Sequence, residues 1–247
     1  LGDGRLVLTA ANTFTGPVSM HGGVLSVSSM ASLGGAASLN LGATLQITGS
    51  TAVSIDKNIL LTANGALDIA NTAGVTLDSQ ISGGFNFTKS GAGNLTLTRA
   101  NTFNGTTTVT GAGQLILGHR DALQFSTLNS SGSVAFAEGV GTFVLGGLSG
   151  SANMVLQDTG AGAVNLRVAG NGSVYTGVLS GTGGLTKIGQ NSRVNPTHVT
   201  NSTLTLGAAQ TYTGATTLTG SVSAPIGTGN SANALILDFN NAAAPAS

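Results

Sequence analysis

An internal repeat limits what this chain can fold into more than any other feature. Residues 4 to 27 read GRLVLTAANTFTGPVSMHGGVLSV, and residues 93 to 117 read GNLTLTRANTFNGTTTVTGAGQLIL. The shared Asn-Thr-Phe triplet places Asn101 89 residues after Asn12. A third copy, STLTLGAAQTYTGATTLTGSVS, occupies residues 202 to 223. Such repetition is typical of architectures in which each unit buries its apolar face against the next one.

Three positions recur in every copy: an amide, an aromatic residue and a glycine. They are Asn12, Phe14 and Gly16 in the first copy, Asn101, Phe103 and Gly105 in the second, and Gln210, Tyr212 and Gly214 in the third. In a stacked solenoid, amides in register can hydrogen-bond along the axis, so we expect Asn12, Asn101 and Gln210 to form such ladders. A lysine also recurs, since Lys89 in FNFTKSGAGNL matches Lys187 in LTKIGQNS.

The units break into short alternating segments, which predict strands. LVLT, VLSV, TLQIT, ALDIA, VTLDS, LTLT, QLIL, TLTL and ALILDF alternate with period two and are rich in Val, Leu, Ile and Thr. Gly-rich turns separate them, and no segment shows a capped 3.6-residue pattern. A sandwich core would need large apolar anchors and a Greek key would need longer crossings. The pattern therefore predicts an all-β, right-handed, single-stranded parallel β-helix, continuous over residues 1-247, with repeat motifs at about 1-27, 84-118 and 178-223.

Composition narrows the class of partner. Charged residues are 6% of the chain, Gly is 39 of 247 residues and aromatics are 4%, so small and β-branched side chains must build the core. Eight basic and eight acidic residues give a net charge of zero, so no basic stripe exists to neutralise phosphates and nucleic acid is not an expected partner. The lack of net charge also favours association between copies.

The sequence carries no cysteine and therefore no disulfide framework or thiolate metal site. No apolar run approaches the roughly 18 residues that a membrane span requires. The chain starts at Leu1 without a secretory pattern, so we expect any signal peptide to lie upstream or to have been removed.

Residues 84 to 115, GFNFTKSGAGNLTLTRANTFNGTTTVTGAGQL, resemble the autotransporter-associated β-strand repeat, also called the passenger-associated transport repeat. Residues 1 to 27 match its second half, and residues 178 to 223 match it with an interruption, QNSRVNPTHV. The resemblance implies a parallel β-helix exported to the surface of a bacterial cell or into the medium. It implies no activity of its own.

The residues that could act as catalytic or ligand-binding groups do not form a recognisable site in the sequence. Asp56, Asp68 and Asp78 are spaced by less than a coil, so we expect them on different faces or turns rather than as an acid/base pair. The triplet His119-Arg120-Asp121 could bind an anion or a glycan, but its position after QLILG favours a surface turn. His21 and His198 have no neighbour at metal-ligand spacing. We expect no catalytic residue, no cofactor and no metal.

The aromatic residues leave one alternative open. Phe85, Phe87 and the repeated Phe14, Phe103 and Tyr212 could form a sugar-stacking strip, although their repetition at one motif position favours a stacked core or corner.

The sequence thus predicts a structural rod, a stalk or fibre segment, with a glycan-binding adhesin as the alternative and a carbohydrate-active enzyme as a distant third. Because an uncapped solenoid end exposes unpaired backbone groups, we expect both ends to continue into further coils of the same chain or of a neighbouring copy.

Overall fold

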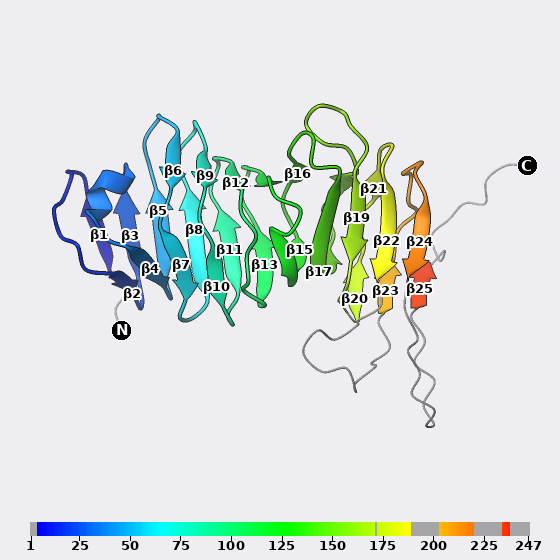
Figure 1. The fold of residues 1–247 in the computed structure, drawn as a ribbon, viewed down its shortest axis with the longest axis horizontal. Helices are drawn as coiled ribbons and strands as arrows, with labels where there is room; N and C mark the ends of the chain where they lie inside the picture. Colours follow the sequence, from blue (N-terminus) through cyan, green and yellow to red (C-terminus); the bar gives the residue numbers. More distant parts are fainter. Residues whose placement is uncertain (1–3, 171, 189–202, 220–233, 238–247) are drawn as a thin grey trace, which may run out of the picture.

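A computed structural model of the chain describes residues 4–170, 172–188 and 203–219, together with the backbone of residues 234–237. Within these ranges the regular structure is β-strand apart from one 3-10 turn, η1 (Met30–Leu33). The strands stack side by side along the long axis, from β1 (Arg5–Leu8) at one end to β24 (Thr216–Thr219) and β25 (Ala234–Leu237) at the other (Figure 1). Every pair of these strands is parallel. The predicted parallel β-solenoid is confirmed.

The strands form sheets that run the length of the molecule. A 14-stranded sheet, called here the wide sheet, contains β1, β3 (Val24–Val27), β5 (Thr44–Ile47), β8 (Gly65–Ile69), β11 (Phe87–Ser90), β13 (Thr106–Val109), β15 (Leu123–Ser130), β17 (Thr142–Gly150), β19 (Asn165–Val168), β20 (Ser173–Tyr175), β22 (Gly184–Ile188), β23 (Thr203–Leu206), β24 and β25. A four-stranded sheet contains β2 (Val18–Met20), β4 (Ser38–Leu41), β7 (Asn58–Leu61) and β10 (Ile81–Gly83). A five-stranded sheet contains β6 (Val53–Ile55), β9 (Val75–Leu77), β12 (Leu95–Leu97), β14 (Leu115–Leu117) and β16 (Val134–Phe136), and β18 (Met154–Val155) pairs with β21 (Leu179–Ser180).

Each coil passes through three sides in a fixed order. The chain runs from β5 in the wide sheet to β6 in the five-stranded sheet, then to β7 in the four-stranded sheet, and returns to the wide sheet at β8. Partners on neighbouring coils are about 20 residues apart, as Val24 and Thr44 are. Beyond β15 the wide sheet covers two sides of the solenoid, because β17 bends around a corner. Thr142 at its start pairs with β19, and Gly150 at its end pairs with β20.

Alternation places one row of side chains inside and the next outside on each side of the coil. Leu25, Leu45 and Leu67 occupy successive strands of the wide sheet in register, and the last two are fully buried. Burying each such side chain contributes about 1.5–3 kcal/mol relative to exposing it, an upper estimate because the unfolded chain is itself partly compact. The core is therefore a set of aliphatic rows that run along the axis.

The repeat and the coil do not share a period. The strand before the recurring amide is β1 in the first copy and β23 in the third, both in the wide sheet, but it is β12 of the five-stranded sheet in the second copy. The second copy is thus rotated by one side of the coil relative to the other two. Like residues of different copies therefore do not stack above one another.

The recurring glycine is explained by how closely the coils approach. A Cβ atom on Gly105 would lie 2.2 Å from the backbone oxygen of Phe85 on the coil below, and one on Gly214 would lie 2.3 Å from that of Gly183. A Cβ atom on Gly16 would meet nothing within 4 Å, because Gly16 lies on the first described coil. The motif requires glycine where another coil lies directly beneath it.

We predict that Gly105→Ala destabilises the chain by about 3 kcal/mol or more, because the added methyl group overlaps backbone that cannot move aside. The matched change Gly16→Ala should alter stability by no more than about 0.5–1 kcal/mol, since neither glycine needs a positive φ and the site is open. Urea unfolding of both variants measures the difference. Equal effects would contradict the explanation.

Candidate functional site

The recurring amides bind backbone of neighbouring coils, not one another. Asn101 is buried, its Oδ1 accepts the N–H of Ile81 at 2.7 Å, and its Nδ2 donates to the Ala122 oxygen at 2.9 Å. The Asn12 Nδ2 donates to the Ser32 oxygen at 2.7 Å in the same way. The expected ladder of amide upon amide is wrong, because the copies lie several coils apart and the second copy lies on a different side from the other two.

Gln210 in the third copy makes the bond to the coil below that Asn101 makes. Its Oε1 accepts the N–H of Leu179 at 2.6 Å, and its Nε2 donates to the Ala208 oxygen at 2.7 Å. All three amides therefore satisfy backbone groups at a corner where the strand ladder is interrupted. Their local role is the same although the corner differs.

The aromatic residues at the motif position do not form a strip. Phe103 is buried and packs edge-on against Phe87, with ring centroids 5.9 Å apart. Phe14 is 42% exposed at the first described coil, and Tyr212 is partly buried against the core. These rings fill corners of different coils, so a continuous sugar-stacking surface is not built from them.

Two lysines lie inside the solenoid. Lys89 pairs in register with Leu67 and Val109, and Lys187 pairs with Val168 and Leu218, so each ammonium interrupts an aliphatic row. Both side chains are fully buried. Sequence reasoning noted that the two lysines match but gave them no role. The position of Lys89 could have predicted its burial, because it lies two residues after the inward-facing Phe87 in the same strand and therefore points to the same side.

The ammonium groups are held by carbonyl oxygens of the corner turns. The Lys187 Nζ donates to the oxygens of Ile188, Ala169 and Gly170 at 2.8, 3.0 and 3.0 Å. The Lys89 Nζ donates to the Gly91 oxygen at 3.1 Å. Each lysine thereby ties backbone at the corner where its strand ends.

Burial lowers the pKa of both amines. The pKa of Lys187 falls to about 8 because desolvation disfavours its charged form. Burial lowers the pKa of Lys89 as well, and the carboxylate of Asp68 opposes that shift. The shifts express the cost of an interior charge.

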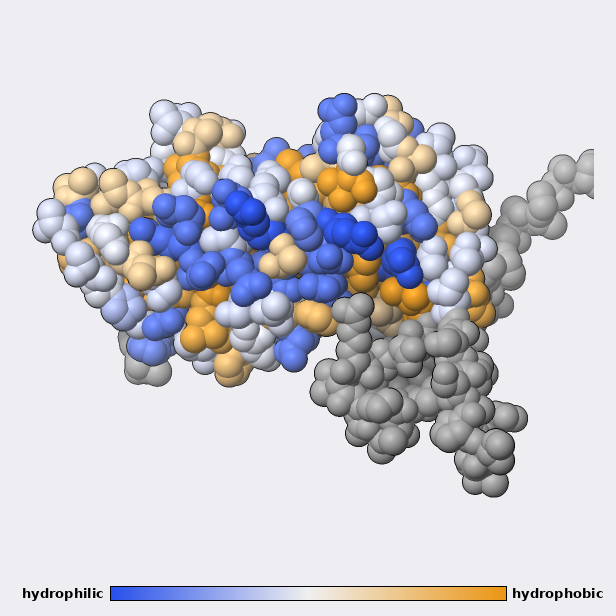
Figure 2. All heavy atoms as spheres, in the orientation of Figure 1, coloured by the Kyte–Doolittle hydropathy of each residue, from blue (hydrophilic) through white to orange (hydrophobic). Residues whose placement is uncertain are grey.

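A row of polar side chains crosses the outer face of the wide sheet. Gln46 donates to Asp68 at 2.7 Å, and Ser90 donates to the other carboxylate oxygen at 3.3 Å. Ser26 donates to Gln46 at 3.0 Å, and Arg5 donates to Ser26 at 3.1 Å. Figure 2 shows a hydrophilic band along this face of the molecule. Because these groups satisfy each other, they stabilise the stack of β1 to β11 and offer little to a ligand.

The three predicted carboxylates do not meet. Asp68 lies in β8 within the polar row, so its assignment to a turn is wrong. Asp56 and Asp78 follow Ile55 and Leu77, which pair in register, so they are one coil apart on the same edge rather than on different faces. Asp78 binds Arg99 at 2.7 Å, which lowers the pKa of its carboxyl.

The other polar candidates lie apart. His119 accepts the N–H of Asp121 at 3.0 Å in a turn, where the exposed Arg120 lies 3.6 Å from the Asp121 carboxylate. Among the described residues no group of three or more His, Cys, Asp or Glu could hold a metal ion. His198 and the interruption QNSRVNPTHV lie outside the described residues.

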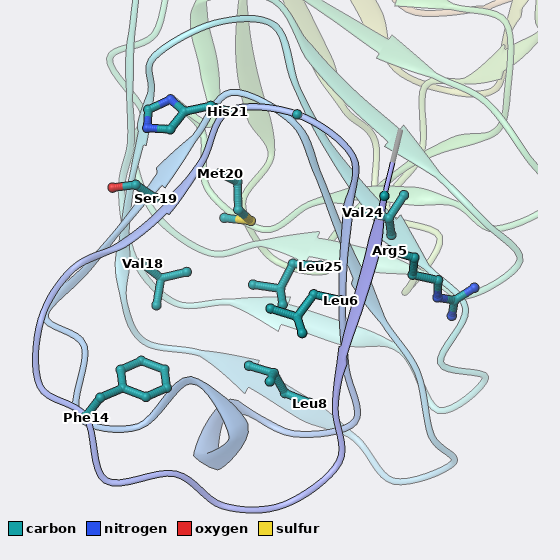
Figure 3. A pocket seen from close by; sticks show the side chains of 12 residues that line it. Arg5, Leu6, Leu8, Phe14, Val18, Ser19, Met20, His21, Val24 and Leu25 are labelled. Atoms are coloured by element: carbon teal, nitrogen blue, oxygen red, sulfur yellow. The ribbon is translucent and has the colours of Figure 1, made fainter. Parts of the chain in front are cut away.

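The end of the solenoid at β1 is hollowed. Leu6, Leu8, Val18 and Leu25 point into the space that the first coil encloses, and Arg5 points away from it (Figure 3). Leu6 is 58% exposed although it pairs with the buried Leu25 and continues its inward row. This concavity is an uncovered layer of core.

Within the described ranges, no helix is long and apolar enough to cross a membrane.

We predict that Lys187 makes stability rise with pH between about pH 8 and 10. In that range the folded state has released the Lys187 proton, while the unfolded chain, with an ordinary lysine pKa of 10.5, still binds it. Lys187→Met should reduce this rise and leave the part that Lys89 contributes, and Lys57→Met should leave the rise unchanged. Urea unfolding at a series of pH values tests both variants. An identical pH profile for wild type and Lys187→Met would contradict the assignment.

Comparison with known proteins agrees with the repeat geometry. The family model described as the passenger-associated-transport-repeat matches residues 1–27, 87–117 and 201–220. The adhesin BmaC autotransporter of Brucella suis biovar 1 (strain 1330) is 34% identical over 236 residues, which covers 87% of this chain and 6% of that protein. The chain thus spans a small part of its relative's length. No solved structure matches it.

These matches indicate a secreted, cell-surface bacterial protein. Each of the three matched segments contains a corner at which the recurring amide binds backbone of a neighbouring coil. The chain is a passenger-associated-transport-repeat protein whose repeats are wound into a parallel β-solenoid.

Proposed function

We propose that this chain is a rod segment of an extracellular passenger, and that its function is to supply length and stiffness. The observation that carries the proposal is the unbroken parallel pairing of strands from β1 to β25, with a continuous aliphatic core along the axis. Each coil contacts its neighbours, so length grows with the number of coils while the cross-section stays the same.

Association through the uncovered layer at β1 is part of this proposal. Leu6 and Leu8 present an inward apolar row that a further coil would bury, and the strand edge of β1 offers its backbone groups to another strand. Such a coil can come from the same protein or from a second copy. A head-to-tail contact of this kind does not close and would extend the rod.

Adhesion is the second candidate function, because the relative that matches most of this chain is an adhesin. In that case the rod would also present binding groups on its sides, toward glycans or toward host or neighbouring surfaces. The two functions are compatible, since a stiff rod is a suitable support for laterally placed contacts.

We predict that the isolated chain associates end to end at micromolar concentration and that Leu6→Asp weakens this association at least tenfold. A carboxylate placed in the uncovered layer would have to be buried in the contact. Leu60→Asp is the matched control, because Leu60 is also exposed, at 43%, but lies on the side of the rod in β7. Light scattering and electron microscopy give the measurement. Monomers at all concentrations, with β1 protected from hydrogen exchange, would refute end-to-end association.

We also predict that the purified chain does not turn over glycans, because each of the three carboxylates has its own partner. Asp56 lies 3.9 Å from the Lys57 ammonium, Asp68 accepts from Gln46, and Asp78 binds Arg99. Incubation with polysaccharides followed by reducing-sugar detection tests this. Turnover that is lost in Asp68→Asn or Asp78→Asn would overturn the non-enzymatic assignment.

A further inference from the structure

Two phenylalanines stand out on one edge of the rod, where each coil enters the wide sheet. Phe85 precedes β11 and Phe125 lies in β15, and their side chains are 44% and 46% exposed. Single exposed apolar residues are ordinary. These two, however, lie two coils apart at the same edge.

The register shows how close they lie. Phe87 pairs with Thr107, so Gly105 lies on the coil next to Phe85. Thr106 pairs with Thr127, so Ser126 lies opposite Gly105 on the following coil and Phe125 is its neighbour in the chain. The Ser126 hydroxyl donates to the Gly105 oxygen at 2.6 Å, which fixes this stacking. Strands in a sheet are about 4.7–4.9 Å apart, so the two phenylalanines are separated by about 9–10 Å along the axis.

Glycine occupies this edge on the coil that follows each phenylalanine. No side chain fits at Gly105, because a Cβ atom there would lie 2.2 Å from the Phe85 oxygen. The same alternation continues, since a Cβ atom on Gly146 would lie 2.4 Å from the carbonyl carbon of Phe125. Phenylalanine and glycine therefore alternate on successive coils at this edge, as Phe85, Gly105, Phe125 and Gly146.

Neutral amides flank the rings. Asn86 and Asn104 are exposed, and the Asn86 Oδ1 accepts the N–H of Thr106 at 2.8 Å, which holds the Asn86 side chain against the next coil. No charged residue occurs in residues 82–88, 101–108 or 122–127. A ligand of this surface must offer apolar faces to the rings and neutral hydrogen-bonding groups to the amides. Sugar rings do both, with C–H groups on their faces and hydroxyl groups on their rims.

We propose that this aromatic edge, formed by Phe85, Asn86, Asn104, Gly105 and Phe125, binds a neutral glycan chain that runs along the rod. One sugar packs on each phenylalanine, the chain passes over Gly105, and the asparagine amides bind hydroxyl groups. The proposal rests on the adhesive part of the proposed function and gives it a site and a ligand class. An anionic ligand is disfavoured, because no cation lies in these segments.

The test measures binding of cellohexaose, maltohexaose and chitohexaose to the full chain by saturation-transfer NMR and calorimetry. At least one should bind, Phe85→Ala or Phe125→Ala should weaken its affinity about tenfold, and the double variant should abolish binding. Leu60→Ala is the matched control, and it should bind like the wild type. Circular dichroism and urea unfolding verify that each variant is folded.

Several outcomes would overturn the site. They are no binding of the three neutral glycans by the folded wild type, binding that the double variant retains, and binding of a sulfated glycan alone. If the double variant loses glycan binding but still forms rods, the two functions are separate. If rods fail to form while the glycan still binds, the rod proposal fails and the site stands.

Discussion

Parallel hydrogen bonding between successive coils is the interaction on which the rest of this structure depends. A strand such as β8 has one neighbour about 20 residues earlier and another about 20 residues later, and without both its backbone groups would lack partners inside the sheet. The same stacking that satisfies the backbone brings Leu45 and Leu67 together within the core. Backbone pairing and apolar burial are therefore set by one geometric condition, which is that every coil follows the path of the coil below it.

That condition explains which residues the motif keeps. Gly105 leaves room for the coil beneath, Asn101 binds backbone where the path turns, and Phe103 fills the corner next to Phe87. These interactions are between neighbouring coils only. They therefore work equally well when the second copy of the repeat is rotated by one side, and the motif needs no fixed face of the solenoid.

The two interior lysines show that the solenoid tolerates buried charged groups in its core. A buried ammonium is costly, and the pKa of Lys187 near 8 expresses that cost. The amine nevertheless donates to three carbonyl oxygens of a corner within 3.0 Å, which compensates part of the desolvation. Lysine can reach a turn that no aliphatic side chain could bind, so the charge is placed where backbone would otherwise face the core.

The sequence by itself determined the fold class, because alternating strands, short glycine turns and a recurring motif leave few architectures other than a solenoid. It also excluded a dense cluster of catalytic groups, since so few charges are present. Only the tertiary structure decided which residues share a side. The relation of a repeat to a coil depends on the length of every turn between them. Small differences in those lengths rotated Asn101 away from Asn12, brought Asp56 and Asp78 to one edge, and placed Phe85 and Phe125 two coils apart at another edge. The alternation of residues along a strand decides which side chains point inward. Which residues are neighbours on adjacent coils depends on the lengths of all the strands and turns between them, and no local sequence pattern gives that.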